Sequence, residues 1–367
     1  MTMIIYLLAF IFVLSIVVIV HEGGHFVMAR LCGVKVTVFS VGFGKKLWSR
    51  MDKKGTEWRL CALPLGGYVQ MLGDEDAASM KKSDSGLSEE EKKYTFMAQP
   101  LYKRALIIFA GPFMNYLFAI VGLALVYMTI GQMHLTTEVG EVIPGSMAEE
   151  AGILPGDVIV EINGQKVEDF SDLKRKVVIS NFGEVLTVVA ERGTERVSFH
   201  ILPKPVEGEE NGVPLLGVRT RPFAEMKKER YNPVVAVGKA VETVYVMTID
   251  TTVYLWQVIT GQRSADDMRG PVGIAEASGD AAKAGMLAMF LFLIQVSVGI
   301  GFVNLLPIPL LDGGHLAMYA YEAVVRRPMS EALQNALLKV GVVLLLFLFA
   351  FTLFKDVPRV AQRMLGL

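Results

Sequence analysis

Residues 21–25 read His-Glu-Gly-Gly-His and bring together three side chains that could activate a water molecule. Because His21 and His25 are four residues apart, both imidazoles would lie on one face of a helix and could bind one zinc ion. Glu22 stands between them and could accept a proton from water activated by that zinc. Residues 1–20 carry no charged side chain, so the motif is expected in a helix that spans a lipid bilayer.

A catalytic zinc usually takes three protein ligands and keeps one position open for water. The chain contains four apolar segments. If each crosses a membrane once, the first and third run parallel, and their C-terminal ends emerge on the same side. Asp312 is the only carboxylate near that end of the third segment, and we expect it to be the third ligand. The alternative is that Asp312-Gly313-Gly314 is a simple turn at a helix end. His315 is a rival ligand, but we expect it to be an outer residue of the site or a histidine at a helix start, and to face away because it follows a glycine pair.

Glycines and prolines interrupt the second half of the third apolar segment. Unwound backbone at membrane depth is tolerated only where it lines a cavity or packs in protein. We therefore expect Asn304 and Pro307 to contact a substrate, with Asn304 bonding its backbone or stabilising an oxyanion. For Asn304 the alternative is a hydrogen bond between two helices.

The composition is typical of a membrane protein. Of 367 residues, 52% are hydrophobic and only 20% are charged. The net charge of −1 gives no electrostatic support to nucleic-acid binding. The two cysteines, Cys32 and Cys61, form no disulfide framework, and their thiols would stay reduced if their segment is cytosolic.

Four apolar segments are long enough to cross a bilayer, which takes about 20 residues. They are residues 3–28, 105–131, 284–311 and 332–354. Residues 233–261 repeat apolar side chains at helical spacing, but charged residues interrupt them. That pattern indicates an amphipathic helix that lies on the membrane or against the protein.

Residues 34–43 and 57–71 alternate apolar and polar side chains and predict β-hairpin structure. Because this region directly follows the His-Glu-Gly-Gly-His motif, we expect it to fold back beside the metal. An edge strand there could bind the freed backbone of an unwound substrate helix. The alternative is an ordinary cytosolic β loop, and residues 74–93 predict a charged linker with a short helix.

About 150 residues between the second and third apolar segments predict a small soluble domain. Strand-like runs alternate with turn signals such as Pro155-Gly156-Asp157 and Asn163-Gly164. The expected strands and helices fall at residues 140–143, 158–162, 185–190 and 197–202, and at residues 147–151 and 171–179. Together they predict a small α+β barrel.

Basic residues near the apolar segments set the expected orientation. Arg30, Lys35, Lys103 and Arg104 flank the first two segments on one side, and Arg326 and Arg327 follow the third on that same side. We therefore expect the metal site near the cytosolic side and the α+β domain outside, which in a bacterium is the periplasm. Lys355, Arg359 and Arg363 in the tail disagree with this orientation.

Several motifs give the chain a family resemblance. They are His21-Glu22-Gly23-Gly24-His25, Val41-Gly42-Phe43-Gly44, Pro64-Leu65-Gly66-Gly67-Tyr68-Val69, Gly111-Pro112-Phe113-Met114-Asn115, Arg269-Gly270-Pro271-Val272-Gly273-Ile274, and the N-x-x-P-x-x-x-L-D-G pattern of residues 304–313. Over nearly its whole length the chain resembles the site-2 proteases, which are zinc intramembrane proteases. It is most similar to their bacterial branch, which cleaves anti-sigma factors and includes the regulator of sigma-E protease.

The resemblance implies zinc ligands at His21, His25 and Asp312, with Glu22 as the catalytic base. It also implies that the α+β domain is a PDZ domain, which would bind a peptide or chain end, or would act as a size filter. The best-known members of this branch carry two tandem PDZ domains, whereas this chain has room for one. Substrate gating by a tandem pair is therefore in doubt here.

We thus expect an α-helical polytopic membrane protein with four transmembrane helices, a membrane-associated β-hairpin region and an inserted α+β PDZ domain. The expected divisions are a first transmembrane helix (1–30), a cytosolic-side β-hairpin region with a charged linker (31–103), a second helix (104–131), the PDZ domain (135–206), a periplasmic linker with an amphipathic helix (207–283), a third helix (284–315), a fourth helix (332–354) and a tail (355–367).

The expected function is hydrolysis of a peptide bond within the transmembrane segment of single-span membrane proteins in a bacterial inner membrane. A trimmed anti-sigma factor or a signal-peptide remnant would be a suitable substrate, and the setting would be regulated intramembrane proteolysis in a stress response. The alternatives are a PDZ-containing membrane adaptor with an inactive metal site and a metal transporter. Neither explains why a base stands between the two histidines.

Overall fold

The computed structural model describes residues 2–73, 87–134, 136–178, 185–202, 204–205, 214–219, 227–261, 265 and 268–365. The chain divides into two compact units, a helical unit and an α+β unit. The helical unit contains Met1–Gly122 and Arg269–Leu367, and the α+β unit contains Leu123–Met268. Much of the charged linker expected at residues 74–93 lies outside the described residues.

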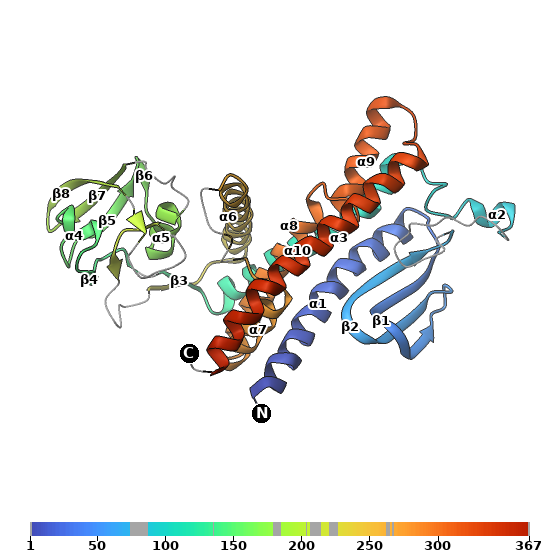
Figure 1. Cartoon of the computed structure of the whole chain (residues 1–367), viewed down its shortest axis with the longest axis horizontal. Coiled ribbons are helices and arrows are strands. Elements are labelled where there is room, and N and C mark those ends of the chain that lie inside the picture. Colours follow the sequence, from blue (N-terminus) through green and yellow to red (C-terminus); the bar gives the residue numbers. More distant parts are fainter. Residues whose placement is uncertain are drawn as a thin grey trace. The chain divides into compact units, whose positions relative to one another are not determined.

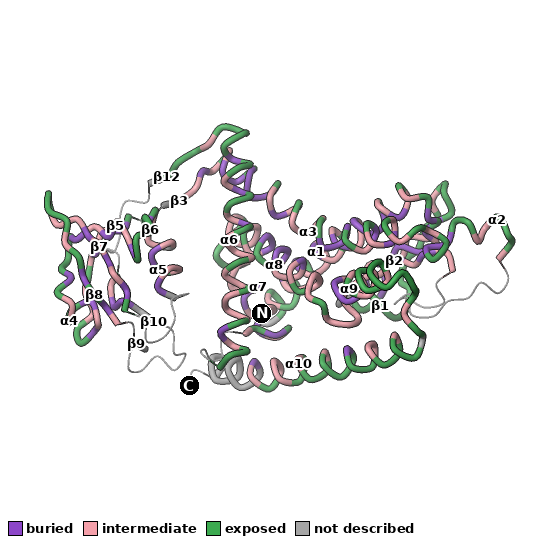
Figure 2. Tube along the Cα trace, turned by 90° about the horizontal axis from the view of Figure 1, so that it is seen from above, coloured by how far each residue is buried: buried purple, intermediate pink, exposed green. Residues whose placement is uncertain are grey.

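Within the described ranges, four helices are long and apolar enough to cross a membrane (Figure 1). They are α1 (Thr2–Leu31), α3 (Leu101–Thr129), α8 (Met286–Leu305) and α10 (Glu331–Leu365). Most of their apolar side chains are not buried by protein, and in α10 only 6% of the most apolar window is buried (Figure 2). Helices that expose apolar side chains in this way are suited to a lipid environment.

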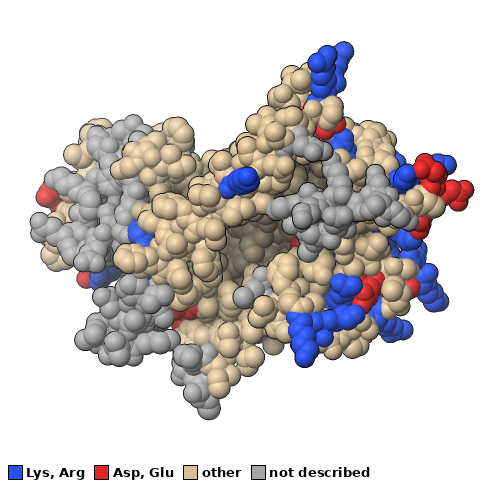
Figure 3. All heavy atoms as spheres, turned by 45° about the vertical axis from the view of Figure 1, so that its right-hand side comes forward, with Lys and Arg blue, Asp and Glu red and all other residues tan. Residues whose placement is uncertain are grey.

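Charged side chains gather beside the spanning helices and leave much of the helical surface uncharged (Figure 3). Arg326 and Arg327, which follow α9 (Asp312–Val325), are both exposed. The short helix α2 (Glu89–Lys92) adds further charges and begins at Ser88, whose hydroxyl caps the backbone N–H of Glu91. This separation of charged and apolar surfaces is what a membrane boundary requires.

The predicted third span is two helices separated by an irregular segment. Helix α8 ends at Leu305, residues 306–311 are not helical, and α9 begins at Asp312. The glycines at 313 and 314 let α9 pack directly on the backbone of this segment, because a Cβ atom at either position would collide with carbonyl groups of residues 305, 306 and 308. The irregular segment therefore places Asp312 at the first turn of a new helix.

Part of the region expected to be a linker is helix α7 (Pro271–Ala284), which belongs to the helical unit. It packs against α1 through small side chains, and a Cβ atom at Gly279 would overlap the ring of Tyr6. The Tyr6 hydroxyl donates a hydrogen bond to Asp280 Oδ1 at 2.7 Å and accepts one from Lys283 Nζ at 2.8 Å. The prediction of a linker is therefore wrong for residues 271–283.

Strands β1 (Val36–Met51) and β2 (Glu57–Met71) form an antiparallel two-stranded sheet that bends back on itself. Residues 38–41 pair with 67–70 and also with 57–60, so residues 67–71 form an outer segment of the sheet. Arg30 at the end of α1 donates to Asp52 Oδ2 at 2.5 Å and to Thr56 Oγ1 at 2.9 Å. Burial alone would raise the pKa of Asp52, but bonds from the Thr56 N–H and Arg30 lower it below its ordinary value.

The α+β unit is built around a four-stranded sheet in the order β6-β5-β7-β8. Its elements are β3 (Gln132–His134), β4 (Glu141–Val142), α4 (Met147–Glu150), β5 (Val158–Ile162), β6 (Gln165–Lys166), α5 (Phe170–Val178), β7 (Leu186–Arg192), β8 (Glu195–Ile201), β9 (Lys204–Pro205), β10 (Pro214–Leu215), β11 (Val218–Arg219), β12 (Lys227–Glu229) and α6 (Pro233–Ile259). Alternate residues of β7 point inward and are fully buried (Leu186, Val188 and Ala190). This is the period-two pattern of a half-buried strand.

One ion pair with a buried carboxylate supports this sheet. Asp157, which is 1% exposed, accepts from Arg192 Nε at 2.7 Å and from Arg192 Nη2 at 2.8 Å. The same carboxylate accepts the backbone N–H of Leu154 at 2.9 Å. The Arg192 hydrogen bond is the main cause that lowers the pKa of Asp157 below its ordinary value.

Candidate metal centre and active site

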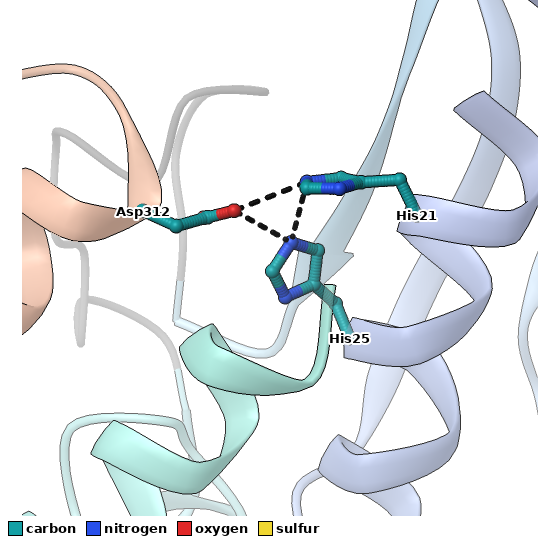
Figure 4. Close-up of side chains that lie close together, drawn as sticks. All are labelled: His21, His25 and Asp312. Carbon is teal, nitrogen blue, oxygen red and sulfur yellow. Dashed lines mark hydrogen bonds and ion pairs between the residues drawn. The ribbon is translucent and has the colours of Figure 1, made fainter. Parts of the chain in front are cut away.

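Three side chains from two helices converge in the helical unit (Figure 4). His21 and His25 project from one face of α1, and Asp312 projects from the first turn of α9. Asp312 Oδ2 lies 3.1 Å from His21 Nε2 and 3.5 Å from His25 Nε2, and the two Nε2 atoms are 3.2 Å apart. Both histidines are 8% exposed, so these atoms face one another away from solvent.

The spacing of these three atoms fits a tetrahedral metal ion. Zinc bound at about 2.0–2.1 Å separates neighbouring ligand atoms by about 3.3 Å in a tetrahedron. The three measured separations, 3.1, 3.2 and 3.5 Å, lie close to that value. In addition, Asp312 Oδ2 is buried and accepts no hydrogen bond within the described part of the chain, which is costly for a carboxylate unless a cation binds it. The residues present therefore fit zinc.

The contact of His25 with α3 determines which of its nitrogens can bind a metal. His25 Nδ1 lies 2.9 Å from the carbonyl oxygen of Ile107. Because a carbonyl oxygen can only accept, Nδ1 must carry the proton and donate it. The Nε2 lone pair of the neutral imidazole is then free to bind a metal ion.

Helix α3 passes very close to both imidazoles, and this closeness depends on glycines. A Cβ atom at Gly111 would collide with the ring of His25 and come within 3.0 Å of His21 Cε1. On α1, a Cβ atom at Gly24 would collide with the carbonyl of Ala110. The two glycines let the α3 backbone lie directly against the histidines.

A cavity of about 490 Å³ opens beside the three converging side chains. Glu22 lines it together with the histidines and Asp312. Strand β2 forms another part of its wall through Gly67, Tyr68, Val69 and Met71. Gly67 packs so closely that a Cβ atom there would come within 3.4 Å of Glu22 Cγ. The structure thus places the outer β2 segment beside the potential base.

The remaining predicted site residues differ in their positions. Asn304 lines the cavity, whereas Pro307 is exposed and is not one of the described lining residues. His315 also lines the cavity, so the prediction that it faces away is wrong. The reason is that α9 begins at Asp312. His315 is therefore one helical turn further along and lies on the same face.

A charged pair lies in another part of the cavity wall. Arg104 Nη2 on α3 donates to Glu322 Oε1 on α9 at 2.9 Å, and both residues line the cavity. The Arg104 guanidinium carbon lies 5.2 Å from the centre of the Tyr319 ring. The pair joins the helix that carries Asp312 to the helix that lies against the histidines.

Sequence reasoning placed Asn115 in a family motif but missed its role: the residue is 0% exposed and its side chain lies 3.2 Å from His21 Nδ1. It also missed the close approach that Gly24 and Gly111 permit. The available signal was an amide in an otherwise apolar segment, four residues after a glycine. A buried amide in a spanning helix needs a partner, but the sequence does not say which helix provides it.

Two histidines and an aspartate that fit zinc, with a glutamate beside them in a spanning helix, define the class of membrane metalloproteases. The profile of Peptidase family M50 matches residues 9–348. A protein of Agrobacterium fabrum, provisionally named a zinc metalloprotease, is 40% identical over 362 residues, which cover 96% of this chain and 95% of that protein. Metalloprotease MmpA of Caulobacter vibrioides is 37% identical over 383 residues, with 96% of this chain and 95% of MmpA covered.

The chain therefore belongs to peptidase family M50 and is a zinc metalloprotease.

Proposed function

We propose that this chain is an intramembrane endopeptidase that hydrolyses a peptide bond in the transmembrane segment of single-span membrane proteins. The observation that carries the proposal is the near-tetrahedral spacing of the His21, His25 and Asp312 ligand atoms. The two histidines belong to α1, whose N-terminal run is uncharged. A hydrolytic site that is reached through apolar helices suits a substrate that is itself in the bilayer.

In the proposed mechanism His21, His25 and Asp312 hold zinc, which when bound polarises a carbonyl and makes water nucleophilic near neutral pH. Glu22 takes the proton of the attacking water at its carboxylate. It then delivers that proton to the amine that leaves when the peptide C–N bond breaks. Asn304, which lines the same cavity, is proposed to donate a hydrogen bond to the substrate backbone or to the developing oxyanion.

The substrate helix must unwind before it can be cut, because its peptide groups are bonded within the helix. We propose that residues 67–71 of β2 bind the unwound segment as an added strand. Support comes from the position of this outer segment, which lines the cavity and contacts Glu22 through Gly67. Pro307 is proposed to contact the same substrate from the irregular segment after α8.

The α+β unit is proposed to contain a single PDZ domain that senses a trimmed chain end or excludes intact proteins by size. Its four-stranded sheet with two short helices is compatible with that proposal. We further propose that the chain lies in a bacterial inner membrane with this domain in the periplasm and the metal site near the cytosol, as the exposed Arg326 and Arg327 favour. Trimmed anti-sigma factors and signal-peptide remnants are the proposed substrates, in a stress response.

The test is cleavage of a tagged single-span protein by the purified chain in liposomes. Wild type and Glu22→Gln would each be offered the substrate with and without its outer domain. Cleavage of the trimmed substrate by wild type alone would support both the protease and its selection of trimmed substrates. Cleavage of both forms would keep the protease and reject the selection. Equal cleavage by wild type and Glu22→Gln would reject the role of Glu22, whereas cleavage by neither, with zinc bound, would favour an adaptor with an inactive metal site.

A further inference from the structure

Asn115 is a fully buried polar residue of α3 whose side chain has no role in the mechanism above. Its side-chain amide nitrogen lies 3.2 Å from His21 Nδ1. Its side-chain oxygen is buried and has no hydrogen-bond partner among the residues that the structure describes. A buried amide oxygen without a partner is costly, so this arrangement calls for a physical explanation.

Metal binding requires the opposite orientation of this amide. His21 Nε2 faces Asp312 Oδ2 and must offer a lone pair to a metal, so the proton of the neutral imidazole resides on Nδ1. An N–H at Nδ1 needs an acceptor, and an amide NH₂ group cannot accept. Turning the Asn115 amide by 180° exchanges its oxygen and nitrogen, which have nearly the same shape. The oxygen then accepts the His21 proton and gains the partner that it lacks.

We propose that Asn115 is a positioning residue for His21. Its side-chain oxygen accepts the Nδ1–H of His21 and thereby fixes the tautomer and ring orientation that expose Nε2 to zinc. The carbonyl oxygen of Ile107 accepts the Nδ1–H of His25 in the same way. One helix, α3, therefore orients both histidines of another helix. This inference rests on the proposed zinc site.

Contacts with α8 hold Asn115 in place. The Ser297 hydroxyl donates to the backbone carbonyl of Asn115 at 3.0 Å, and Ser297 is fully buried. A Cβ atom at Gly301 would lie 3.1 Å from Asn115 Cβ, so the two helices touch at this point. Contacts with α8 fix the backbone of Asn115 on one side of α3. On the other side of α3, Gly111 lets the helix lie close to the histidines. The side-chain amide of Asn115 therefore has little freedom to move.

Two substitutions at Asn115, each with a side chain of similar shape, distinguish the loss of the hydrogen-bond acceptor from a change in packing. Asn115→Asp keeps an acceptor oxygen, whereas Asn115→Leu keeps the branched shape and removes the acceptor. Zinc affinity would be measured by competition with a chelator on the full purified chain in detergent, and the visible absorption of the Co²⁺-loaded protein would report ligand geometry. We expect Asn115→Leu to lose roughly 10–100-fold in zinc affinity, the usual effect of losing such a partner, and to alter the Co²⁺ spectrum.

Asn115→Asp is expected to restore zinc affinity to within a few-fold of wild type. Ser297→Ala is the matched control, because it weakens the contact between α3 and α8 at Asn115 without removing the acceptor for His21. We expect it to bind zinc as wild type does. Wild-type zinc affinity in Asn115→Leu would overturn the proposal, and so would an equal loss in Asn115→Leu, Asn115→Asp and Ser297→Ala, which would indicate packing alone.

The same experiment distinguishes failure of the zinc site from failure of this inference. Wild type should bind one zinc per chain, and His25→Ala should lose it. If wild type binds no zinc, or if His25→Ala binds it unchanged, the proposed metal site itself is rejected. If both behave as expected and the Asn115 variants do not differ from wild type, only the role of Asn115 is rejected.

Discussion

The helical unit and the α+β unit both bury charged or polar side chains, but they surround them differently. In the α+β unit Asp157 is paired with Arg192 and with a backbone N–H, behind a conventional sheet core. In the helical unit Asp312 Oδ2 faces two imidazole nitrogens and accepts no hydrogen bond from the described residues. One carboxylate is satisfied within the protein, and the other is arranged for a ligand.

The two units also differ in what covers their apolar side chains. The inward residues of β7 are fully buried by protein, whereas spanning helices such as α10 leave most apolar side chains uncovered. In the α+β unit protein atoms provide the core, and in the helical unit lipid takes much of that role. Beside the metal site, Gly24 and Gly111 let α1 and α3 make close contacts with each other. Substitutions that alter only the metal site, only the helix contacts or only the sheet should show what each of these parts contributes.

The largest effect is expected at the carboxylate arranged for a metal. Asp312→Asn removes the negatively charged ligand, so cleavage should be lost. Zinc affinity should fall by more than about 100-fold, which exceeds the loss expected when a residue that only orients a ligand is replaced. Metal content after dialysis and cleavage in liposomes would measure both effects. His315→Gln is the matched control, because it lies one turn away in the same cavity and should retain zinc. Loss of zinc in His315→Gln but not in Asp312→Asn would make His315 the third ligand.

The next effect is expected where α1 and α3 touch. Gly24→Ala should force these helices apart, because its Cβ atom would collide with the Ala110 carbonyl. We expect a loss of about 1–3 kcal/mol in the free energy of unfolding, together with lower zinc affinity. Thermal unfolding of the full chain in detergent would measure the first effect.

Gly23→Ala is a matched control for the same helix. A Cβ atom at Gly23 meets nothing within 4 Å, so the substitution should be neutral or stabilise the helix by up to about 1 kcal/mol. Equal destabilisation by Gly23→Ala and Gly24→Ala would mean that close helix contact is not what requires glycine here.

An effect of similar size on the free energy of unfolding is expected at the ion pair in the cavity wall. Arg104→Ala leaves Glu322 without its partner, and we expect the helical unit to lose about 1–3 kcal/mol, less than for a fully buried pair because Glu322 is partly exposed. Chemical denaturation of Arg104→Ala, Glu322→Ala and the double variant would form a thermodynamic cycle. The double variant should be less destabilised than the sum of the two single variants. Additive effects would show that the pair does not couple α3 to α9.

The smallest effect is expected in the α+β unit. The pKa of Asp157 is lower in the folded chain than the unfolded value of about 3.9, so its pair with Arg192 stabilises the fold above about pH 4. That contribution is lost as the pH falls through the folded pKa. Asp157→Asn should therefore cost about 1–2 kcal/mol at pH 7 and progressively less at lower pH. Hydrogen exchange of peptides from β5, β7 and β8 would measure it.

The exposed pair Arg196–Glu191 on the same sheet provides the control for that measurement. Its two side chains are 68% and 44% exposed, so Arg196→Ala should change the free energy of unfolding by less than about 0.5 kcal/mol. A loss at Asp157→Asn as small as that at Arg196→Ala would contradict the role given to the buried pair.

The sequence was sufficient to predict where His21, His25 and Asp312 would meet. Helical spacing placed the histidines on one face, and the order of the apolar segments brought Asp312 to the same side. It was not sufficient for Asn115, because an amide in an apolar helix does not indicate which neighbour it contacts. It also misled at α7, whose small residues gave low hydropathy and suggested a linker, although small residues are what allow two helices to pack closely.

The position of His315 shows a different limit. Its direction depended on whether Asp312 ends a helix or begins one, and the glycines at 313 and 314 are compatible with either. The structure begins α9 at Asp312, so three residues make almost one turn and both side chains reach the cavity. A shift of a helix boundary by a few residues is enough to reverse such a prediction.

The cavity beside the histidines also limits how much water the enzyme can hold. A cavity of about 490 Å³ has room for many water molecules. A peptide segment that enters the same space must displace most of them, yet hydrolysis consumes one. In the proposed mechanism substrate and solvent therefore compete for one volume, and turnover requires one water molecule to stay in place while the others leave.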